Sequence, residues 1–379
     1  MTIAYEVAFY DGTAWTDISD YVAAFQFSRG RSRELDAYQA GTCSVSLRNY
    51  DGRFLPEAFT GVTNTEYAED PIVPGQSVYV RSEGFIVFYG YVEDSRWLYD
   101  AGKTVIAGFT LIDAMSRIGR LTQQLDLSES GVAGDVMETI LNDAQWDATN
   151  DYVTTGTTAN ISVDVTEGQL ALPTVQQIAL AEGVGRLYAH RGLRDLIFEG
   201  RHALAGATVE RTFGDGGIEI LRAEFGYGAD LLYNQVRAES QNGLSYSVSD
   251  TASRAAYGDR SLVRSGLLLN NVWDLQSYCE MLLEFYKEPQ ARVAALTVNL
   301  YALSYNERQH VGALDIGSLV RVVFTPRGAD EIDANFVVEG ISHAATVNSH
   351  EVTLQLSPAP SFSLFELDTD QLDIDQVGP

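Results

Sequence analysis

A group of alternating charges near the start of the chain is the first feature that could do chemistry. Arg29, Arg31 and Arg33 lie close together, and Glu34 and Asp36 follow directly. Such cations could contact phosphates, but their acidic neighbours halve the local charge. Arginine also pairs with carboxylates through a planar guanidinium group that can donate two hydrogen bonds. The cluster therefore predicts ion pairs, inside the chain or with a neighbouring subunit, rather than a nucleic-acid patch.

The overall charge favours the same interpretation. The 379 residues include 52 acidic and 25 basic side chains, which gives a formal net charge of -27. An acidic surface repels nucleic acid, because binding it requires that phosphates be neutralised. The same charge keeps a protein soluble in a crowded assembly. We therefore expect no specific binding of DNA.

Signals for secretion and for membrane insertion are missing. The N-terminus, MTIAYEVAFYDG, has no basic region followed by a long apolar run. The apolar stretch at 85–92 is far shorter than a membrane span. Cys43 and Cys279 lie in apolar patterns, which favours buried free thiols. We expect a chain without a membrane span that is made in a cytosol and is soluble there.

The motifs of common enzyme classes are incomplete. Gly102-Lys103-Thr104 ends like a phosphate-binding loop, but Trp97 stands where that loop needs a glycine. The pair Gly183 and Gly185 lacks the third glycine of a dinucleotide loop. Abundant carboxylates leave an acid–base pair of the glycosidase type open. The histidines are scattered and form no zinc-protease motif: His190, His202, His310, His343 and His350. We expect no catalytic residues, no metal and no cofactor.

The first 112 residues have the pattern of β-strands. Cys43, Val45 and Leu47 alternate with polar residues, as in a half-buried strand. The run at 85–92 is apolar on both faces and predicts a central strand. Short strands separated by regular turns are typical of a barrel or a sandwich.

Helices are expected in the middle of the chain. Residues 131–144 have apolar side chains at a spacing of four, which predicts an amphipathic helix. A second helix should begin at Pro173 and stop at Gly183. Residues 186–200 predict two short strands around a turn. Asp274 is expected to cap a further helix.

These patterns divide the chain into segments. We expect an α+β fold, mostly β, with two hub-type β-barrels of which the second is discontinuous. The segments are an N-terminal barrel (1–112), an α+β domain with helices and a hairpin (113–217), a second barrel (218–240 and 292–358), an insert with one helix that packs with the α+β domain (241–291), and an acidic tail (359–379). The tail either hangs free or adds as a strand to a partner.

An internal similarity favours two related barrels. The two segments that resemble each other are PGQSVYV before FIVFYGYV, and IGSLVRVV before FVVEGIS. Each combines a glycine, a strand, a loop and a second strand that carries a glycine. The spacing from Gly75 to Gly90 differs from that between Gly317 and Gly340. If the similarity is not accidental, it predicts two related barrels separated by an α+β insert.

The region around the arginines also carries an ordered set of motifs. The residues that form it are Arg29, Gly30, Arg31, Glu34, Leu35, Asp36, Ala40, Gly41, Asn49, Asp51, Gly52, Arg53 and Phe54. Their order resembles the start of a family of phage minor tail proteins. Later segments, up to FVVEGISHAATVNSHEVTLQLSPA, resemble the same family, so the resemblance covers nearly the whole chain.

This family is similar to the central hub proteins of phage tail tips and baseplates. The resemblance implies a homotrimer around the tail axis, in which two β-barrels per chain mimic a sixfold ring. It implies contacts with the distal tail protein ring, the tape measure protein and other tail-tip or fibre proteins, and an α+β part that gates the channel. DNA would pass through without specific binding. We expect a structural virion protein of the tail tip, not an enzyme, made in the host bacterial cytoplasm.

The candidate assembly residues come from the charged motifs: Arg29, Arg31, Arg33, Glu34, Asp36 and Arg53. Two alternatives for the function stay open. One is a subunit of the distal tail ring, which would form hexamers; the helical insert and the second barrel disfavour it. The other is a carbohydrate-binding or carbohydrate-hydrolysing tail-tip protein, which the aromatic and carboxylate content favours.

Overall fold

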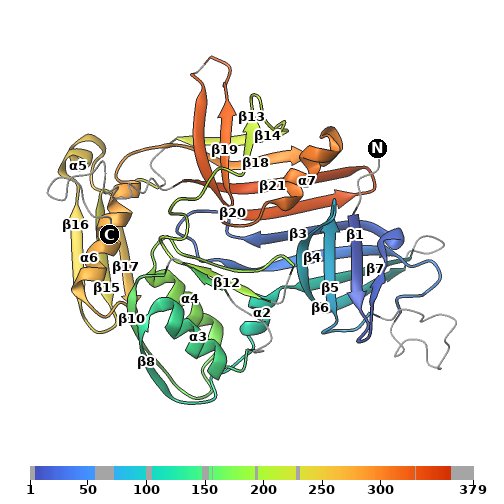
Figure 1. The fold of residues 1–379 in the computed structure, drawn as a ribbon, viewed down its shortest axis with the longest axis horizontal. Helices are drawn as coiled ribbons and strands as arrows, with labels where there is room; N and C mark the ends of the chain where they lie inside the picture. The colour runs from blue at the N-terminus through green and yellow to red at the C-terminus, as the bar shows by residue number, and fades with distance from the viewer. Residues whose placement is uncertain are drawn as a thin grey trace.

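Strands make up most of the regular structure, and several of the helices gather beside the main sheet (Figure 1). A computed structural model describes residues 5–55, 72–99, 105–146, 153–155, 157–192, 195–227, 231–328 and 330–359. The predicted fold class, α+β and mostly β, is confirmed. Within these ranges, no helix is both long enough and apolar enough to cross a membrane.

The largest sheet contains 13 strands and joins both ends of the described chain. Its N-terminal strands are β1 (Tyr5–Tyr10), β2 (Trp15–Asp17), β3 (Val22–Gly30), β4 (Gln39–Arg48), β5 (Ser77–Ser82), β6 (Phe85–Tyr99) and β7 (Val105–Ile112). Its C-terminal strands are β13 (Arg211–Gly214), β14 (Arg222–Tyr227), β18 (Ala291–Asn299), β19 (Leu319–Phe324), β20 (Ile332–Thr346) and β21 (Ser349–Pro358). Short helices η1 (Ser19–Tyr21), η2 (Leu300–Ala302) and α7 (Tyr305–Ala313) lie between strands.

The strand order is β14-β18-β21-β20-β3-β4-β7-β6-β5-β1-β2, and β19 pairs with both β20 and β13. The two halves meet where β3 and β20 pair antiparallel, from Ala24 opposite Thr346 to Gly30 opposite Gly340. We call this pairing the joint. Because β20 occupies the outer edge of β3, that edge is not available to close the first half on itself.

The 13 strands therefore form one continuous sheet, and their hydrogen bonds close no separate barrel among the described residues. Each half is nevertheless strongly curved. Tyr5 in β1 and Phe25 in β3 lie on strands far apart in the order, yet their ring centroids are 5.6 Å apart. Phe225 in β14 and Phe324 in β19 meet in the same way, at 5.2 Å.

The two halves repeat the same strand order. In the first repeat it is β3-β4-β7-β6-β5, and in the second it is β14-β18-β21-β20-β19. The Gly75 N–H donates to the carbonyl of Val92 at 2.7 Å, and the Gly317 N–H donates to the carbonyl of Val338 at 2.8 Å. The φ angles of these glycines are 88° and 87°. The internal similarity in the sequence thus corresponds to a repeated set of strands.

Each repeat also contains a β-bulge at a glutamate that has no partner in the neighbouring strand: Glu93 in β6 and Glu339 in β20. This common bulge aligns Asp94 with Gly340. The match between Gly90 and Gly340 that the sequence suggests is wrong, because Gly90 lies before the bulge.

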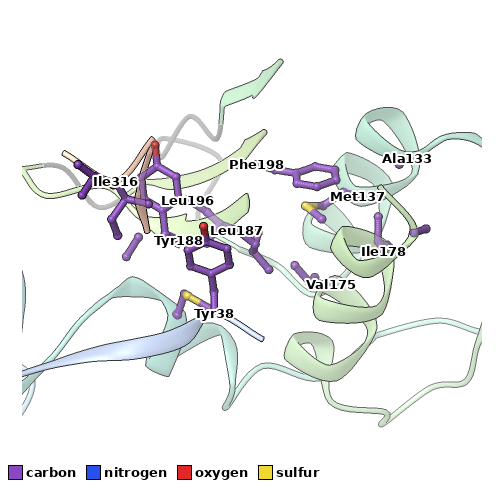
Figure 2. Close-up of a cluster of buried hydrophobic side chains, with 14 of the residues drawn as sticks. Tyr38, Ala133, Met137, Val175, Ile178, Leu187, Tyr188, Leu196, Phe198 and Ile316 are labelled. Carbon is purple, nitrogen blue, oxygen red and sulfur yellow. The ribbon is translucent and has the colours of Figure 1, made fainter. Parts of the chain in front are cut away.

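A small α+β unit shares a core with the second repeat and also contacts β3, β4 and β7 of the first. Its elements are α2 (Ala114–Ile118), β8 (Leu127–Val132), α3 (Ala133–Asp143), β9 (Val153–Thr155), β10 (Asn160–Val165), α4 (Ala171–Ala181), β11 (Arg186–Ala189) and β12 (Leu196–Glu199). The helix predicted at 131–144 is α3. The second predicted helix is α4, which begins two residues before Pro173 and is followed by Gly183 at a φ of 76°. Phe198 of β12 packs against α3, next to Met137 (Figure 2).

The insert forms a separate sheet. Its elements are β15 (Gln235–Ser240), β16 (Ser245–Ser249), α5 (Thr251–Tyr257), β17 (Ser261–Leu267) and α6 (Val272–Tyr286). Two strands lie elsewhere than predicted. The sequence predicts β15 in the second barrel, but this strand pairs with β16 and β17, because its buried Val236 and Ala238 belong to the core shared with α6. The sequence predicts β13 in the α+β domain, but this strand joins the main sheet beside β19.

The cap of α6 also differs from the prediction. Asn271 caps the helix and accepts a hydrogen bond from the Asp274 N–H at 2.8 Å, so Asp274 lies inside the first turn. The tail beyond Ala359 and the motif at 102–104 lie outside the described residues. The division into domains stays a prediction.

The joint leaves no room for side chains at its glycine pair. A Cβ on Gly340 would lie 2.6 Å from the carbonyl oxygen of Arg31, and one on Gly30 would lie 2.3 Å from that of Glu339. Both obstacles are backbone atoms, so the strands themselves would have to separate.

We predict that Gly340→Ala lowers the free energy of unfolding by about 1–3 kcal/mol, because the added methyl group pushes β3 and β20 apart. Gly226→Ala in β14 is the matched control, since its Cβ would meet no atom within 4 Å. Urea denaturation followed by tryptophan fluorescence measures both variants. Equal stability of the two would show that the joint tolerates a side chain.

Candidate functional site

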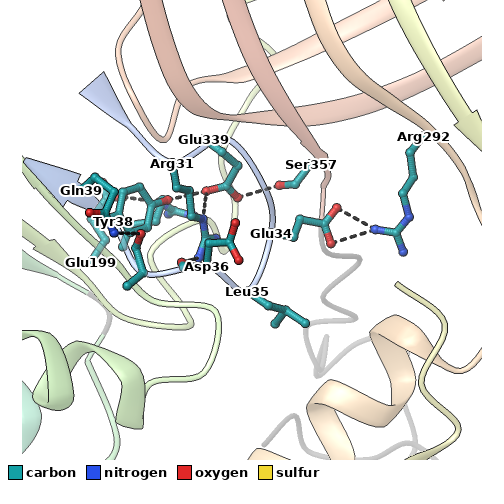
Figure 3. Close-up of polar contacts among 12 residues, drawn as sticks. Arg31, Glu34, Leu35, Asp36, Tyr38, Gln39, Glu199, Arg292, Glu339 and Ser357 are labelled. Carbon is teal, nitrogen blue, oxygen red and sulfur yellow. Dashed lines mark hydrogen bonds and ion pairs between the residues drawn. The ribbon is translucent and has the colours of Figure 1, made fainter. Parts of the chain in front are cut away.

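The predicted charge cluster lies at the joint. β3 ends at Gly30, and residues 31–38, which we call the arm, lead into β4. Gly30 has a φ of 90° and Leu35 one of 65°, so the backbone is left-handed at both positions and reverses direction. The arm thereby lies against β20 and the α+β unit (Figure 3).

Arg29 is buried where three parts of the chain meet. Its guanidinium donates to the carbonyl of Val87 in β6 at 3.2 Å and to that of Ala189 in β11 at 3.1 Å. It also pairs with Asp315, just before β19, at 2.7 Å. A buried charge needs such partners to offset its lost hydration. Arg29 therefore ties both repeats and the α+β unit together.

Arg31 and Glu339 form a buried ion pair beside the joint. Nε of Arg31 lies 2.9 Å from Oε2 of Glu339, and their side chains are 8% and 6% exposed. Glu339 also accepts hydrogen bonds from the hydroxyl groups of Tyr38 and, at 2.6 Å, Ser357 (Figure 3). The guanidinium of Arg31 lies 4.5 Å from the centre of the Tyr38 ring, a favourable cation–π distance.

The surroundings keep this pair charged. Burial alone would raise the pKa of Glu339, but the charges of Arg31 and Arg186 and the hydrogen bonds lower that pKa to about 2. Burial and the Glu339 charge raise the pKa of Tyr38 well above its ordinary value, so its hydroxyl remains a donor. Loss of either partner in such a pair leaves the other charge buried without compensation.

A second ion pair holds the middle of the arm. Nη1 of Arg292 in β18 lies 2.7 and 2.8 Å from the two carboxylate oxygens of Glu34. Burial raises the pKa of Glu34, and the Arg292 charge opposes this rise. Arg264 of β17 donates to the carbonyl of Leu35 at 3.0 Å. The arm thus contacts the second repeat and the insert at once.

The remaining candidate residues are two exposed side chains of the arm and the half-buried Arg53. Arg33 and Asp36 are exposed, and the Arg33 side chain forms no ion pair with another residue that the structure describes. The carbonyl of Asp36 accepts from Nη1 of Arg31 at 3.2 Å. Arg53 lies apart from the arm, 3.5 Å from Asp51. Contacts of these residues with another subunit stay a prediction.

Several buried ion pairs were not predicted from the sequence. They are Arg186 with Glu199 at 2.6 Å, Arg201 with Glu182 at 3.3 Å, and Arg308 with Glu83 at 2.8 Å. Nothing local in the sequence indicated the partners, because even the nearest two, Arg186 and Glu199, are 13 residues apart and lie on different strands.

The described part of the chain offers no evident place for metal chemistry. It contains no group of three or more histidine, cysteine, aspartate or glutamate side chains that could hold an ion. Gly183 and Gly185 follow the end of α4, where the Gly183 N–H donates to the carbonyl of Leu180 at 3.0 Å. Cys43 and Cys279 are free and buried, as predicted, and burial raises the pKa of Cys279 to about 11.

Two of the scattered histidines meet in the core beside the joint. Nδ1 of His343 in β20 lies 2.9 Å from Nε2 of His350 in β21. The His343 ring stacks on Phe27 with centroids 4.5 Å apart, and His350 lies edge-on to Phe25. Burial lowers the pKa of His350 to about 4. Burial, His350 and Arg29 lower the pKa of His343 well below its ordinary value.

Comparisons with solved structures find this architecture elsewhere. A tail protein from Neisseria meningitidis has a TM-score of 0.63 at 14% identity, over 93% of this chain and 96% of that chain. The 43 kDa tail protein of prophage MuSo2 from Shewanella oneidensis has a TM-score of 0.63 at 14% identity, over 94% and 98%. A prophage tail protein from Listeria monocytogenes has a TM-score of 0.56 at 13% identity, over 93% and 94%.

This chain has the fold of phage tail proteins. The likeness includes both repeats and the units between them, since it extends over nearly the full length of each chain. No protein-family model and no curated protein sequence matches the chain.

We predict that Arg31→Ala lowers the free energy of unfolding by about 3–5 kcal/mol, because it leaves the Glu339 carboxylate buried and unpaired. The control is Arg33→Ala, two residues further along the arm, which should change that free energy by less than about 0.5 kcal/mol. Guanidinium denaturation followed by circular dichroism measures both. If Arg31→Ala were as mild as its control, the ion pair would not hold the joint.

We predict that stability falls as the pH drops from about 6.5 to about 4. Unfolded histidines take up protons near pH 6.5, whereas His343 and His350 stay neutral in the fold until lower pH, so the unfolded state binds more protons in this window. Each group contributes a slope of up to about 1.4 kcal/mol per pH unit.

The variant His350→Gln should flatten this slope, whereas His310→Gln, partly exposed on α7, should leave it unchanged. Burial raises the pKa of Asp113 to about 6, which acts in the opposite direction and is present in every variant. Thermal unfolding at a series of pH values supplies the slopes. An unaltered slope in His350→Gln would rule out the histidine pair as its source.

Proposed function

We propose that this chain is a structural protein of a phage tail and that three copies form the central hub of the tail tip or baseplate. The observation that carries the proposal is the likeness in fold to prophage tail proteins, which spans 93% of this chain and 96% of the Neisseria meningitidis protein. The resemblance of the arm motifs to minor tail proteins supports it.

The repeated strand order supports the trimeric arrangement. Each chain supplies two repeats, which we interpret as two hub-type β-barrels that are merged at the joint. Three chains would then place six repeats around the tail axis, so that a threefold protein can match a sixfold ring of distal tail protein. The α+β unit and the insert would form the part that closes or opens the channel.

The charge agrees with a passage for DNA. A net charge of -27 disfavours binding to phosphates, so DNA would pass without specific contacts. The proposed partners are the distal tail ring, the tape measure protein and other tail-tip or fibre proteins. The proposed location is the virion, at the tail tip, and the proposed role includes no catalysis.

We expect native mass spectrometry of the purified chain to show a trimer of the 41.5 kDa subunit. Antibody labelling of purified virions in electron micrographs should place the chain at the tail tip. A stable monomer at high concentration that is absent from virions would overturn the proposal. A hexamer would favour the distal tail ring instead, and turnover of cell-wall polysaccharide would favour an enzyme.

A further inference from the structure

The joint is a contact between two similar repeats within one chain. The outer edge of β3, in the first repeat, pairs with residues 340–346 of β20, in the second. The shared bulge and strand order align β14 with β3, and residues 94–99 of β6 with 340–345 of β20. Each chain therefore carries a second copy of both partner edges.

Both of these second edges are open among the strands that the structure describes. No such strand pairs with the outer edge of β14, which bonds only to β18. β6 pairs with β5 only as far as Tyr91, so residues 94–99 have a described strand neighbour, β7, on one side alone. Open edges present unpaired N–H and C=O groups, and these groups direct the addition of another strand.

Large apolar side chains are exposed along the same two edges. Tyr227 and Phe225 of β14 are 75% and 38% exposed, and Leu98 of β6 is 64% exposed. Exposed apolar side chains that gather beside an open strand edge are typical of a contact surface.

We propose that copies of this chain join head to tail, with β14 of one copy pairing antiparallel to residues 94–99 of β6 in the next, as β3 pairs with β20 within one chain. This inference rests on the proposed homotrimer and names its contact. The partner is a second copy because the two open edges match each other as the two edges of the joint do, and every copy carries both.

The alignment fixes the register between copies. In the alignment of the repeats, Trp97 occupies the position of His343, and Phe225 occupies that of Phe27. His343 lies opposite Phe27 in the joint, so Trp97 of one copy should lie opposite Phe225 of the other. By the same count, Leu98 is opposite Glu224 and Arg96 is opposite Gly226. Arg96 and Glu224 then lie diagonally on one face, where opposite charges attract.

Such a contact is heterologous, because the surfaces that meet are different. Heterologous contacts form a closed ring if the rotation between neighbours closes. If the rotation that relates the two repeats of one chain equals the rotation that relates repeats of neighbouring chains, a ring of three chains is a ring of six similar repeats, evenly spaced.

Engineered disulfides test the register. The double variant Leu98→Cys with Glu224→Cys should form covalent dimers and trimers under mild oxidation, resolved on non-reducing gels. Neither single variant should link to itself, but a mixture of the two should form dimers only. Leu98→Cys with Arg321→Cys, an exposed position on β19, is the control and should not link. The native cysteines are buried.

The outcomes separate the two proposals. If native mass spectrometry finds a trimer but the designed pair does not link, this contact is wrong and the proposed function stands. If no oligomer forms at any concentration, the proposed trimer is wrong and the contact falls with it. Self-linking of a single variant would indicate a symmetric contact and would overturn the head-to-tail arrangement.

A surface variant supplies an independent measurement. Tyr227→Lys should weaken the oligomer by about tenfold or more in its dissociation constant, because it places a charge in the contact. Trp273→Lys is the matched control, since Trp273 is 77% exposed at the start of α6. Analytical ultracentrifugation across a dilution series compares them. Equal dissociation constants would overturn the proposed contact.

Discussion

The buried carboxylate of Glu339 is the constraint on which the joint depends. A charge that is removed from water costs free energy unless cations and donors surround it. Here Arg31, Tyr38 and Ser357 are those partners. They come from the arm and from β21, so the carboxylate is compensated only when the arm has closed and the second repeat has formed. The burial of this side chain therefore couples the closing of the arm to the folding of the second repeat.

Packing and charge together fix the alignment of the two strands at the joint. Buried Phe27 lies opposite buried His343, while Gly30 lies opposite Gly340 and Ser28 lies opposite Ser342. A slip of one residue would turn the buried side chains to the other face of the sheet. It would also move Arg31 away from its carboxylate and leave the charge unpaired. The ion pair thus supports the register that packing sets, even though its net contribution to stability is small.

Local patterns in the sequence predicted individual helices and strands. They could not predict which strands pair or which charges meet, because these contacts join residues that are distant along the chain. The helix α3 and the alternation of β21 follow from spacing alone. The partner of Arg31 lies 308 residues away, and no spacing rule reaches that far. Two closed barrels were expected because each half shows strand patterns, but pairing between β3 and β20 depends on which edges are free. Asn271 and Asp274 are both suitable caps, and only the backbone angles decide between them.

The bulge glutamates show how one position takes two roles. Glu93 and Glu339 occupy the same place in their repeats, yet the side chain of Glu93 is 38% exposed and pairs with Arg120, whereas that of Glu339 is 6% exposed. The difference follows from the arm, which covers only the second repeat. The alignment places Tyr227 at the position of Arg29, so β14 presents an aromatic ring where β3 carries a buried cation. A contact between copies at this edge would leave the carboxylate with Arg120. It would rest on Phe225 and Tyr227 on one face of the sheet and on Leu98 on the other. Such a contact needs no buried charge, which suits subunits that fold first and assemble afterwards.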